Sequence, residues 1–179
     1  MNNLIAHYPN TLSHEQCKIV IDSFERSPHK KKGEVGLGKH TRVKNSTDIG
    51  VYGQKDDLIL NQVYPKFLHY KENAHPFLKI LQCVDIDAGY NLQRYKDDEG
   101  YFLWHCEHSP TEQRRVLAWM VYLNDAQCGT EWMHPYYLSE HKEGSLFIWP
   151  AFWTHAHRGV TPNIGLKYIA TGWCSYYVS

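Results

Sequence analysis

The residues with the clearest chemical potential are His105 and Glu107, which one residue separates. In a β-strand, side chains two positions apart point to the same face, so this imidazole and this carboxylate can meet at one point. A metal needs at least one more ligand, and a later segment offers His155 and His157. Two imidazoles and one carboxylate leave three coordination positions open, which suits an Fe(II) ion whose reactants bind to it directly. Surface histidines that only form hydrogen bonds are the alternative for so short a pattern.

A cation follows the second histidine pair on an apolar segment. Lys167 lies ten positions after His157 and begins the run Lys-Tyr-Ile-Ala-Thr-Gly-Trp. An ammonium group that points inward is costly to bury without a partner, so an inward Lys167 predicts an anionic ligand near the histidines. If this segment is an edge strand, Lys167 faces solvent instead, and the residue alone does not decide between the two.

The elements that must position these residues begin with two helices. Ser13 and Gln16 have the spacing of a capping box, and apolar residues at helical spacing predict an amphipathic helix over 14–26. A second helix is expected over 57–71, which Pro65 should kink or divide.

A polar loop is expected between the two helices, over 28–50, because this segment is basic and rich in glycine. Long loops in compact domains are often functional, so Lys30–Arg42 is a candidate lid over a substrate.

After Pro76 the chain changes to short segments rich in Val, Ile, Tyr, Trp and Thr, separated by turn-forming residues. Several short strands at this spacing are typical of an antiparallel sandwich or barrel. The predicted strands are 79–86, 90–95, 101–106, 115–123, 145–149, 154–160 and 167–178. All six tryptophans and six of the twelve histidines also fall after residue 100, so the chemistry is expected in this β region.

Length and composition limit the class of protein. A chain of 179 residues without a linker or repeat predicts one domain over 1–179, with helical support over about 1–78 and a β core over about 79–179. Nineteen basic and nineteen acidic residues give no net charge, so we expect no nucleic-acid partner. The absence of a membrane-spanning apolar run and of a signal peptide predicts a cytoplasmic protein that binds no membrane. Five scattered cysteines favour neither disulfides nor a thiolate zinc site.

A series of short motifs, each occurring once, lies between about Tyr90 and Trp173. They are Tyr95, Gly100-Tyr101, His105-Cys106-Glu107, Arg115, Tyr122-Leu123-Asn124-Asp125, Cys128-Gly129-Thr130-Glu131, Phe147-Ile148-Trp149-Pro150, His157-Arg158-Gly159 and Lys167. In this order they resemble the catalytic core of the 2-oxoglutarate/Fe(II)-dependent oxygenases of the prolyl 4-hydroxylase-like family. Residues 12–17 and 41–46 are similar to the segment that precedes this core.

The resemblance implies a fold and a set of ligands. The fold is a double-stranded β-helix, or jelly roll, with the N-terminal helices packed against one sheet. Iron is held by His105, Glu107 and His157. The co-substrate 2-oxoglutarate places its distal carboxylate on Lys167, and nearby hydroxyl groups assist. These hydroxyls belong to Tyr95, Tyr122 and Thr130.

The implied reaction is hydroxylation of an aliphatic carbon by O2, with release of succinate and CO2. Peptidyl proline is the leading substrate, a small molecule is the other kind considered, and ascorbate is a further candidate cofactor. The candidate substrate contacts are Trp104, Trp153, Trp173 and Arg42.

The sequence departs from the family pattern at two positions. Glu107 stands where the family usually has Asp, and Cys128 stands where a glycine pair begins. Glu is one methylene longer, so either the metal lies further from the strand or the side chain folds. His157 rather than His155 carries the following glycine and the lysine ten positions later, so His155 is expected beside the ligands or in the pocket.

Two other functions remain open from the sequence. In the first, the substitution by Glu107 has abolished iron chemistry and the chain is a noncatalytic jelly-roll binding module. In the second, the chain is a cupin-type metal isomerase or zinc hydrolase, which would not need Lys167.

Overall fold

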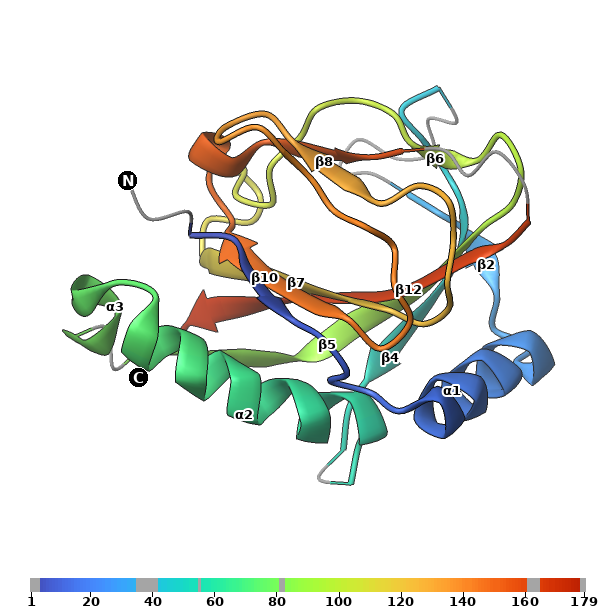
Figure 1. Cartoon of the computed structure of the whole chain (residues 1–179), viewed down its shortest axis with the longest axis horizontal. Coiled ribbons are helices and arrows are strands. Elements are labelled where there is room, and N and C mark those ends of the chain that lie inside the picture. The colour runs from blue at the N-terminus through green and yellow to red at the C-terminus, as the bar shows by residue number, and fades with distance from the viewer. Residues whose placement is uncertain (1–3, 35–41, 55, 81–82, 161–164, 178–179) are drawn as a thin grey trace.

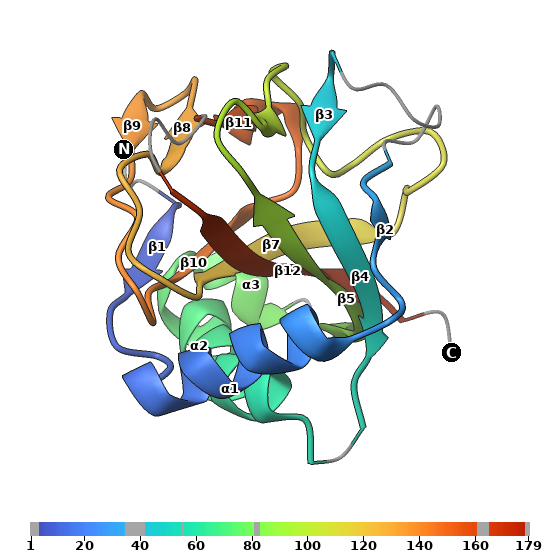
Figure 2. The same cartoon turned by 90° about the vertical axis from the view of Figure 1, so that its right-hand side faces the viewer.

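Two antiparallel sheets face each other, and helices cover the outer side of the larger one (Figures 1 and 2). The computed structural model describes residues 4–34, 42–54, 56–80, 83–160 and 165–177. The large sheet has the order β1 (Ala6–Tyr8), β10 (Leu146–Pro150), β7 (Arg115–Tyr122), β12 (Lys167–Tyr176), β5 (Val84–Tyr95), β4 (Thr47–Tyr52) and β2 (Lys31–Lys32). The small sheet has the order β11 (His157–Gly159), β8 (Thr130–Trp132) and β9 (Tyr137–Leu138). A further pair joins β3 (Lys44–Asn45) to β6 (Gly100–Tyr101). The mainly β architecture is therefore confirmed.

The N-terminal helix begins where the capping box predicts. In α1 (His14–Arg26) the backbone N–H of Gln16 donates to the Ser13 hydroxyl, and the Gln16 side chain accepts from the Ser13 N–H. The second helix, α2 (Leu58–Asn73), begins after Asp57 and is continuous through Pro65. The predicted division at Pro65 is therefore wrong.

The two faces of the large sheet bury different sets of residues. On β12 the even-numbered residues Tyr168 and Ala170 pack with the helices, while odd-numbered residues point toward the small sheet. Strand β7 alternates in the same way, with Trp119 on the helix side and Met120 on the inner side. Because period-two alternation separates the two faces, the inner face is free to carry polar and charged groups. Those on β12 and β5 are Asn91, Gln93, Lys167 and Thr171.

Several predicted boundaries in the β region are wrong. The segments 79–86 and 90–95 are not separate strands, because β5 is continuous and Pro76–Ile80 forms the short helix α3. Only the first residue of 101–106 lies in a strand. The segment 154–160 is divided between the 3-10 turn η1 (Trp153–His155) and β11. Strands β8 and β9 were not predicted.

The prediction of a structureless loop over 28–50 is also wrong, because β2, β3 and the start of β4 lie within it. The polar composition concealed a buried ion pair, in which Lys44 Nζ lies 2.7 Å from Asp48 Oδ2. Both side chains are almost fully buried, so a segment that looked solvated is part of the interior. Residues 35–41, in the candidate lid Lys30–Arg42, lie outside the described residues, and the lid stays a prediction.

No helix in the described part of the chain combines the length and the apolar character that crossing a membrane requires.

Close packing of β12 on β7 generates a prediction about Gly172. A Cβ atom at this position would collide with the indole ring of Trp119, which is fully buried. We expect Gly172→Ala to lower the free energy of unfolding by about 1–3 kcal/mol, as overpacked cores do. Urea denaturation measures this change. The matched control is Gly89→Ala in β5, where a Cβ meets no atom within 4 Å and the expected change is below about 0.5 kcal/mol. Equal effects of the two substitutions would contradict the packing argument.

Candidate active site

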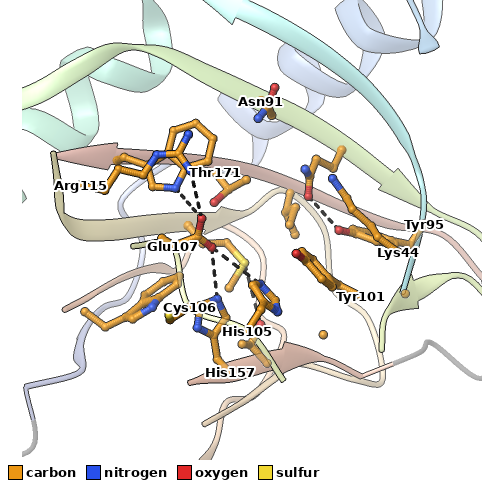
Figure 3. Close-up of a pocket in the computed structure, with 18 of the residues that line it drawn as sticks. Lys44, Asn91, Tyr95, Tyr101, His105, Cys106, Glu107, Arg115, His157 and Thr171 are labelled. Atoms are coloured by element: carbon orange, nitrogen blue, oxygen red, sulfur yellow. Dashed lines mark hydrogen bonds and ion pairs between the residues drawn. The ribbon is translucent and has the colours of Figure 1, made fainter. Parts of the chain in front are cut away.

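A cavity of about 460 Å³ lies between the two sheets. Its large-sheet wall is formed by inward-facing residues of β5, β7 and β12, and its other walls by β6, the segment after it, and β11. Figure 3 shows this cavity with Glu107, His105 and His157 gathered on one side. Lys167 also lines the cavity, as do the predicted co-substrate residues Tyr95 and Thr130.

The side chains of His105 and Glu107 lie close to that of His157, although neither His105 nor Glu107 is part of a regular strand. The backbones of His105 and His157 exchange two hydrogen bonds, of 3.0 and 2.9 Å, which place the two imidazoles side by side. The Glu107 N–H donates to the carbonyl of Ala151 at 3.0 Å, at the end of β10. Glu107 Oε1 then lies 3.7 Å from His105 Nε2 and 3.4 Å from His157 Nε2. One ligand atom from each of the three residues lies within 4.8 Å of the other two, so the group could hold a metal ion.

The hydrogen bonds of the two imidazoles leave the correct nitrogen free. His105 Nδ1 lies 3.0 Å from the carbonyl of Leu103, and His157 Nδ1 lies 3.1 Å from the carbonyl of His155. Because a carbonyl oxygen only accepts, each Nδ1 carries a proton, so the neutral form of each ring has its lone pair on Nε2. His155 therefore supports His157 through its backbone, while its own ring lies 3.0 Å from the Thr154 hydroxyl.

Charge at the triad favours a dication. Burial, together with the neighbouring His157, lowers the pKa of His105 to about 3, so this imidazole is neutral at physiological pH. Burial alone would raise the pKa of Glu107. The contacts with His157 and His105 and the hydrogen bond from the indole of Trp173 outweigh burial and lower this pKa to about 2. A neutral imidazole beside an ionised carboxylate is what metal coordination requires.

Lys167 is buried and faces the cavity, so the alternative of a solvent-facing edge position is wrong. Its Nζ donates to the backbone carbonyls of Cys128 at 3.2 Å and Gly129 at 3.0 Å. No carboxylate among the described residues lies within ion-pair distance of it. Burial lowers the pKa of Lys167 to about 8. Such an ammonium group is ready to bind an anion in the cavity.

The loop beneath Lys167 explains the second departure from the family pattern. A Cβ at Gly129 would collide with the backbone carbonyl of Ser139, so only glycine fits there. Cys128 contributes its carbonyl to Lys167, an interaction that any residue could provide.

Two of the three predicted hydroxyl residues lie beside Lys167, and the third contacts one of them. Its Nζ lies 6.0 Å from the ring centroid of Tyr95 and 5.7 Å from that of Tyr122. The Tyr122 hydroxyl donates to Thr130 Oγ1 at 2.9 Å, and Tyr122 itself is fully buried behind the cavity wall. These positions agree with a carboxylate pocket, and the roles of the three residues stay predictions.

A polar network on the large-sheet wall of the cavity was missed from the sequence. Gln93 Nε2 donates to Asp48 Oδ2 at 3.3 Å, and the hydroxyl of Tyr95 donates to Gln93 Oε1 at 2.8 Å. The network therefore joins the Lys44–Asp48 pair to Tyr95. Alternation of polar residues with Leu92 in 90–95 was the signal that could have placed Gln93 on the inner face.

The four candidate substrate residues occupy different environments. Trp173 lines the cavity, but its indole N–H donates to Glu107 Oε2 at 2.7 Å. Trp104 lies under the guanidinium of Arg158, 4.5 Å from ring centroid to Cζ, and Trp153 is 79% exposed. Neither of these two, nor the exposed Arg42, is among the described residues that line the cavity. Their contacts with a substrate stay predictions.

Comparisons with known proteins agree with this geometry. Residues 90–175 match the family model described as the 2OG-Fe(II) oxygenase superfamily. No curated protein matches the chain in sequence.

Among solved structures, a prolyl hydroxylase from Trichoplax adhaerens, in complex with a hypoxia inducible factor oxygen degradation domain peptide fragment, is similar at TM-score 0.78 and 13% identity over 97% of this chain and 84% of that one. A Pseudomonas putida prolyl-4-hydroxylase gives TM-score 0.75 and 12% identity, with 96% and 92% covered.

The viral collagen prolyl hydroxylase of Paramecium Bursaria Chlorella virus-1, as its 2OG complex, gives TM-score 0.74 and 14% identity, with 98% and 97% covered. At these identities the structural likeness establishes the fold, a jelly-roll core, and the family model adds the class of enzyme. The members of this class use Fe(II), 2-oxoglutarate and O2. Residues 90–175 thus form a domain of the 2OG-Fe(II) oxygenase superfamily, and the chain has the fold of the prolyl 4-hydroxylases.

Proposed function

We propose that the protein hydroxylates an aliphatic carbon of a peptidyl proline, with His105, Glu107 and His157 as iron ligands and Lys167 as the 2-oxoglutarate anchor. One observation carries the proposal. A single cavity joins three metal-ligand side chains to a buried lysine that has no carboxylate partner among the described residues. A metal site alone would not need this lysine, and a carboxylate-binding pocket alone would not need the triad.

The residues present fit an iron ion and its co-substrate. Both Nε2 atoms and Glu107 Oε1 point to one place, and both Nδ1 protons are held by backbone carbonyls. An iron ion held by these residues would supply the activation of O2 by which 2-oxoglutarate is converted to succinate and CO2 and one oxygen atom enters a substrate C–H bond. The balance is one 2-oxoglutarate, one O2 and one C–H bond consumed for one succinate, one CO2 and one alcohol formed.

The protein's own groups set the geometry of that reaction. As metal ligands the two imidazoles would contribute no charge and the carboxylate one negative charge, which would hold a dication without neutralising it. Lys167 offers a charge-assisted hydrogen bond to the distal carboxylate of 2-oxoglutarate, which fixes the end of the co-substrate away from the iron. The apolar side chains of Met120, Trp149 and Ile169 line the same cavity and limit the access of water.

Two arguments favour a peptide as the substrate. The structural neighbours include a prolyl hydroxylase in complex with a peptide and a collagen prolyl hydroxylase. A second cavity of about 430 Å³ shares Thr111, Glu112 and Arg115 with the first and is lined mainly by polar groups. An extended peptide could place one proline in the first cavity while its neighbouring residues lie in the second.

Succinate release tests the substrate class. With Fe(II), 2-oxoglutarate and ascorbate present, we expect proline-containing peptides to raise succinate release at least tenfold over the substrate-free rate. The same peptides with alanine in place of proline should have no effect, and mass spectrometry should find 16 Da added to the proline peptide. Release that responds to free proline or other small molecules but to no peptide would contradict the peptide assignment and leave the oxygenase assignment intact.

The buried lysine predicts how co-substrate affinity depends on pH. Lys167 binds a carboxylate only while it is protonated, and its pKa is lowered to about 8. The KM for 2-oxoglutarate should therefore be constant below this pH and rise by about tenfold for each pH unit above it. Steady-state kinetics between pH 6.5 and 9.5 measure this profile.

Lys167→Met is the matched control, because it keeps the aliphatic stem and removes the charge. At pH 7 it should raise the KM for 2-oxoglutarate by about 30-fold or more, since loss of one partner of a buried charged pair costs about 2–5 kcal/mol. The residual KM of this variant should not change with pH. A KM that is the same in both proteins would contradict the role of Lys167 as the 2-oxoglutarate anchor, and succinate release by neither protein would favour a cupin-type metal enzyme that does not use 2-oxoglutarate.

A further inference from the structure

We propose that Trp173 and Arg115 are positioning residues that hold the outer oxygen of Glu107, so that this longer carboxylate presents a single oxygen to the metal. The inference rests on the proposed role of Glu107 as a metal ligand. It gives Trp173 a function other than substrate contact.

The two oxygens of Glu107 have separate partners. Oε1 faces the histidines, at 3.4 Å from His157 Nε2 and 3.7 Å from His105 Nε2. Oε2 accepts a hydrogen bond of 2.7 Å from Trp173 Nε1 and lies 3.7 Å from Arg115 Nη1. Figure 3 shows the carboxylate between Arg115 on one side and the two histidines on the other. A carboxylate held in this way cannot turn both oxygens toward the metal without losing the Trp173 bond.

The partners of Oε2 are themselves fixed. The Arg115 guanidinium lies over the Trp173 ring, with Cζ 3.7 Å from a ring centroid, and its Nη2 lies 3.3 Å from Glu112 Oε1. Arg115 begins β7 and Trp173 lies in β12, which are neighbouring antiparallel strands of the large sheet. Rigid strands therefore position the donor and the cation on the same side of the carboxylate.

Glutamate needs this support more than aspartate does. Its side chain has one more rotatable bond, so ordering it costs more conformational entropy. An anchor on Oε2 removes this freedom before the metal binds. Aspartate at this position is one methylene shorter, and it cannot both reach the indole of Trp173 and face the histidines as Glu107 does.

The indole of Trp173, which is half-buried, differs from those of the buried tryptophans in its hydrogen bonding. In the described part of the chain, the indole nitrogens of Trp119, Trp132 and Trp149 are buried without a hydrogen-bond partner. These three contribute packing alone, whereas Trp173 directs its N–H at a proposed metal ligand. Removal of that N–H should therefore have a consequence that loss of packing does not have.

The test is a double-mutant cycle on metal affinity. Mn(II) binding to the protein without 2-oxoglutarate is measured by electron paramagnetic resonance of the free ion, for wild type, Trp173→Phe, Glu107→Asp and the double variant. Trp173→Phe keeps a ring beneath Arg115 and loses the N–H. It should weaken Mn(II) binding by about tenfold or more, as loss of a hydrogen-bond partner of a ligand does. In the Glu107→Asp protein, the same substitution should change affinity less than twofold, because the shorter carboxylate does not reach the indole.

Two further variants guard against an indirect effect on folding. Trp119→Phe removes a buried indole N–H that has no partner among the described residues, and it should leave Mn(II) affinity unchanged. Arg115→Gln removes the charge beside Oε2 and should weaken Mn(II) binding in the Glu107 background only. Thermal unfolding of each variant confirms that the protein is folded at the temperature of the titration.

The outcomes separate the inference from the function on which it rests. If wild type binds no Mn(II), the assignment of the metal site is wrong, and the positioning role that depends on it is wrong as well. If wild type binds Mn(II) but Trp173→Phe costs nothing, or costs as much with aspartate as with glutamate, the positioning role is overturned while the metal site stands.

Discussion

A buried ammonium group without a carboxylate partner among the described residues is the constraint on which the site depends. Lys167 is 3% exposed, and its interactions with the described residues are hydrogen bonds to two backbone carbonyls and contacts with the faces of two tyrosine rings. Such a group destabilises the free protein unless an anion comes to it. In the same cavity Glu107 is ionised beside His105, which is neutral, so negative charge gathers where a cation is needed. The cavity therefore offers a carboxylate oxygen and two imidazole nitrogens to a cation, and an ammonium group to an anion. A ligand set of a dication and a dicarboxylate satisfies both.

The fold positions these charged groups because side chains alternate between the two faces of each strand. On strand β12, Tyr168 and Ala170 pack in the core beneath the helices, and Lys167 points into the cavity. One face of this strand therefore stabilises the fold, and the other face contributes to the site. The helices stabilise the outer face with apolar contacts and leave the inner face for polar groups. Rigid strands also fix the partners of Glu107, which is how a carboxylate of unusual length can remain in place.

How much of the fold and of the site can be predicted from the sequence depends on how far apart in the sequence the interacting residues lie. The capping box at Ser13, the triad motif and the late lysine are local or ordered patterns, and they predicted α1 and the residues that meet in the cavity. The Lys44–Asp48 pair and the β2–β4 region were missed because polar residues indicate a loop until their partners are known. Strands β8 and β9 are too short to show a periodicity. The Trp173–Glu107 bond joins residues far apart in sequence, and no spacing rule connects them.

The most direct test of the account is whether iron and 2-oxoglutarate bind together in this cavity. Fe(II)-loaded protein is titrated with 2-oxoglutarate without O2, and visible absorption is recorded. The account predicts a weak charge-transfer band that requires both the iron and 2-oxoglutarate and saturates at one equivalent of each. It also predicts that Lys167→Met forms the band only at much higher concentrations of 2-oxoglutarate. No band at saturating Fe(II) and 2-oxoglutarate, in protein that is folded, would contradict the assignment of this cavity as the joint site.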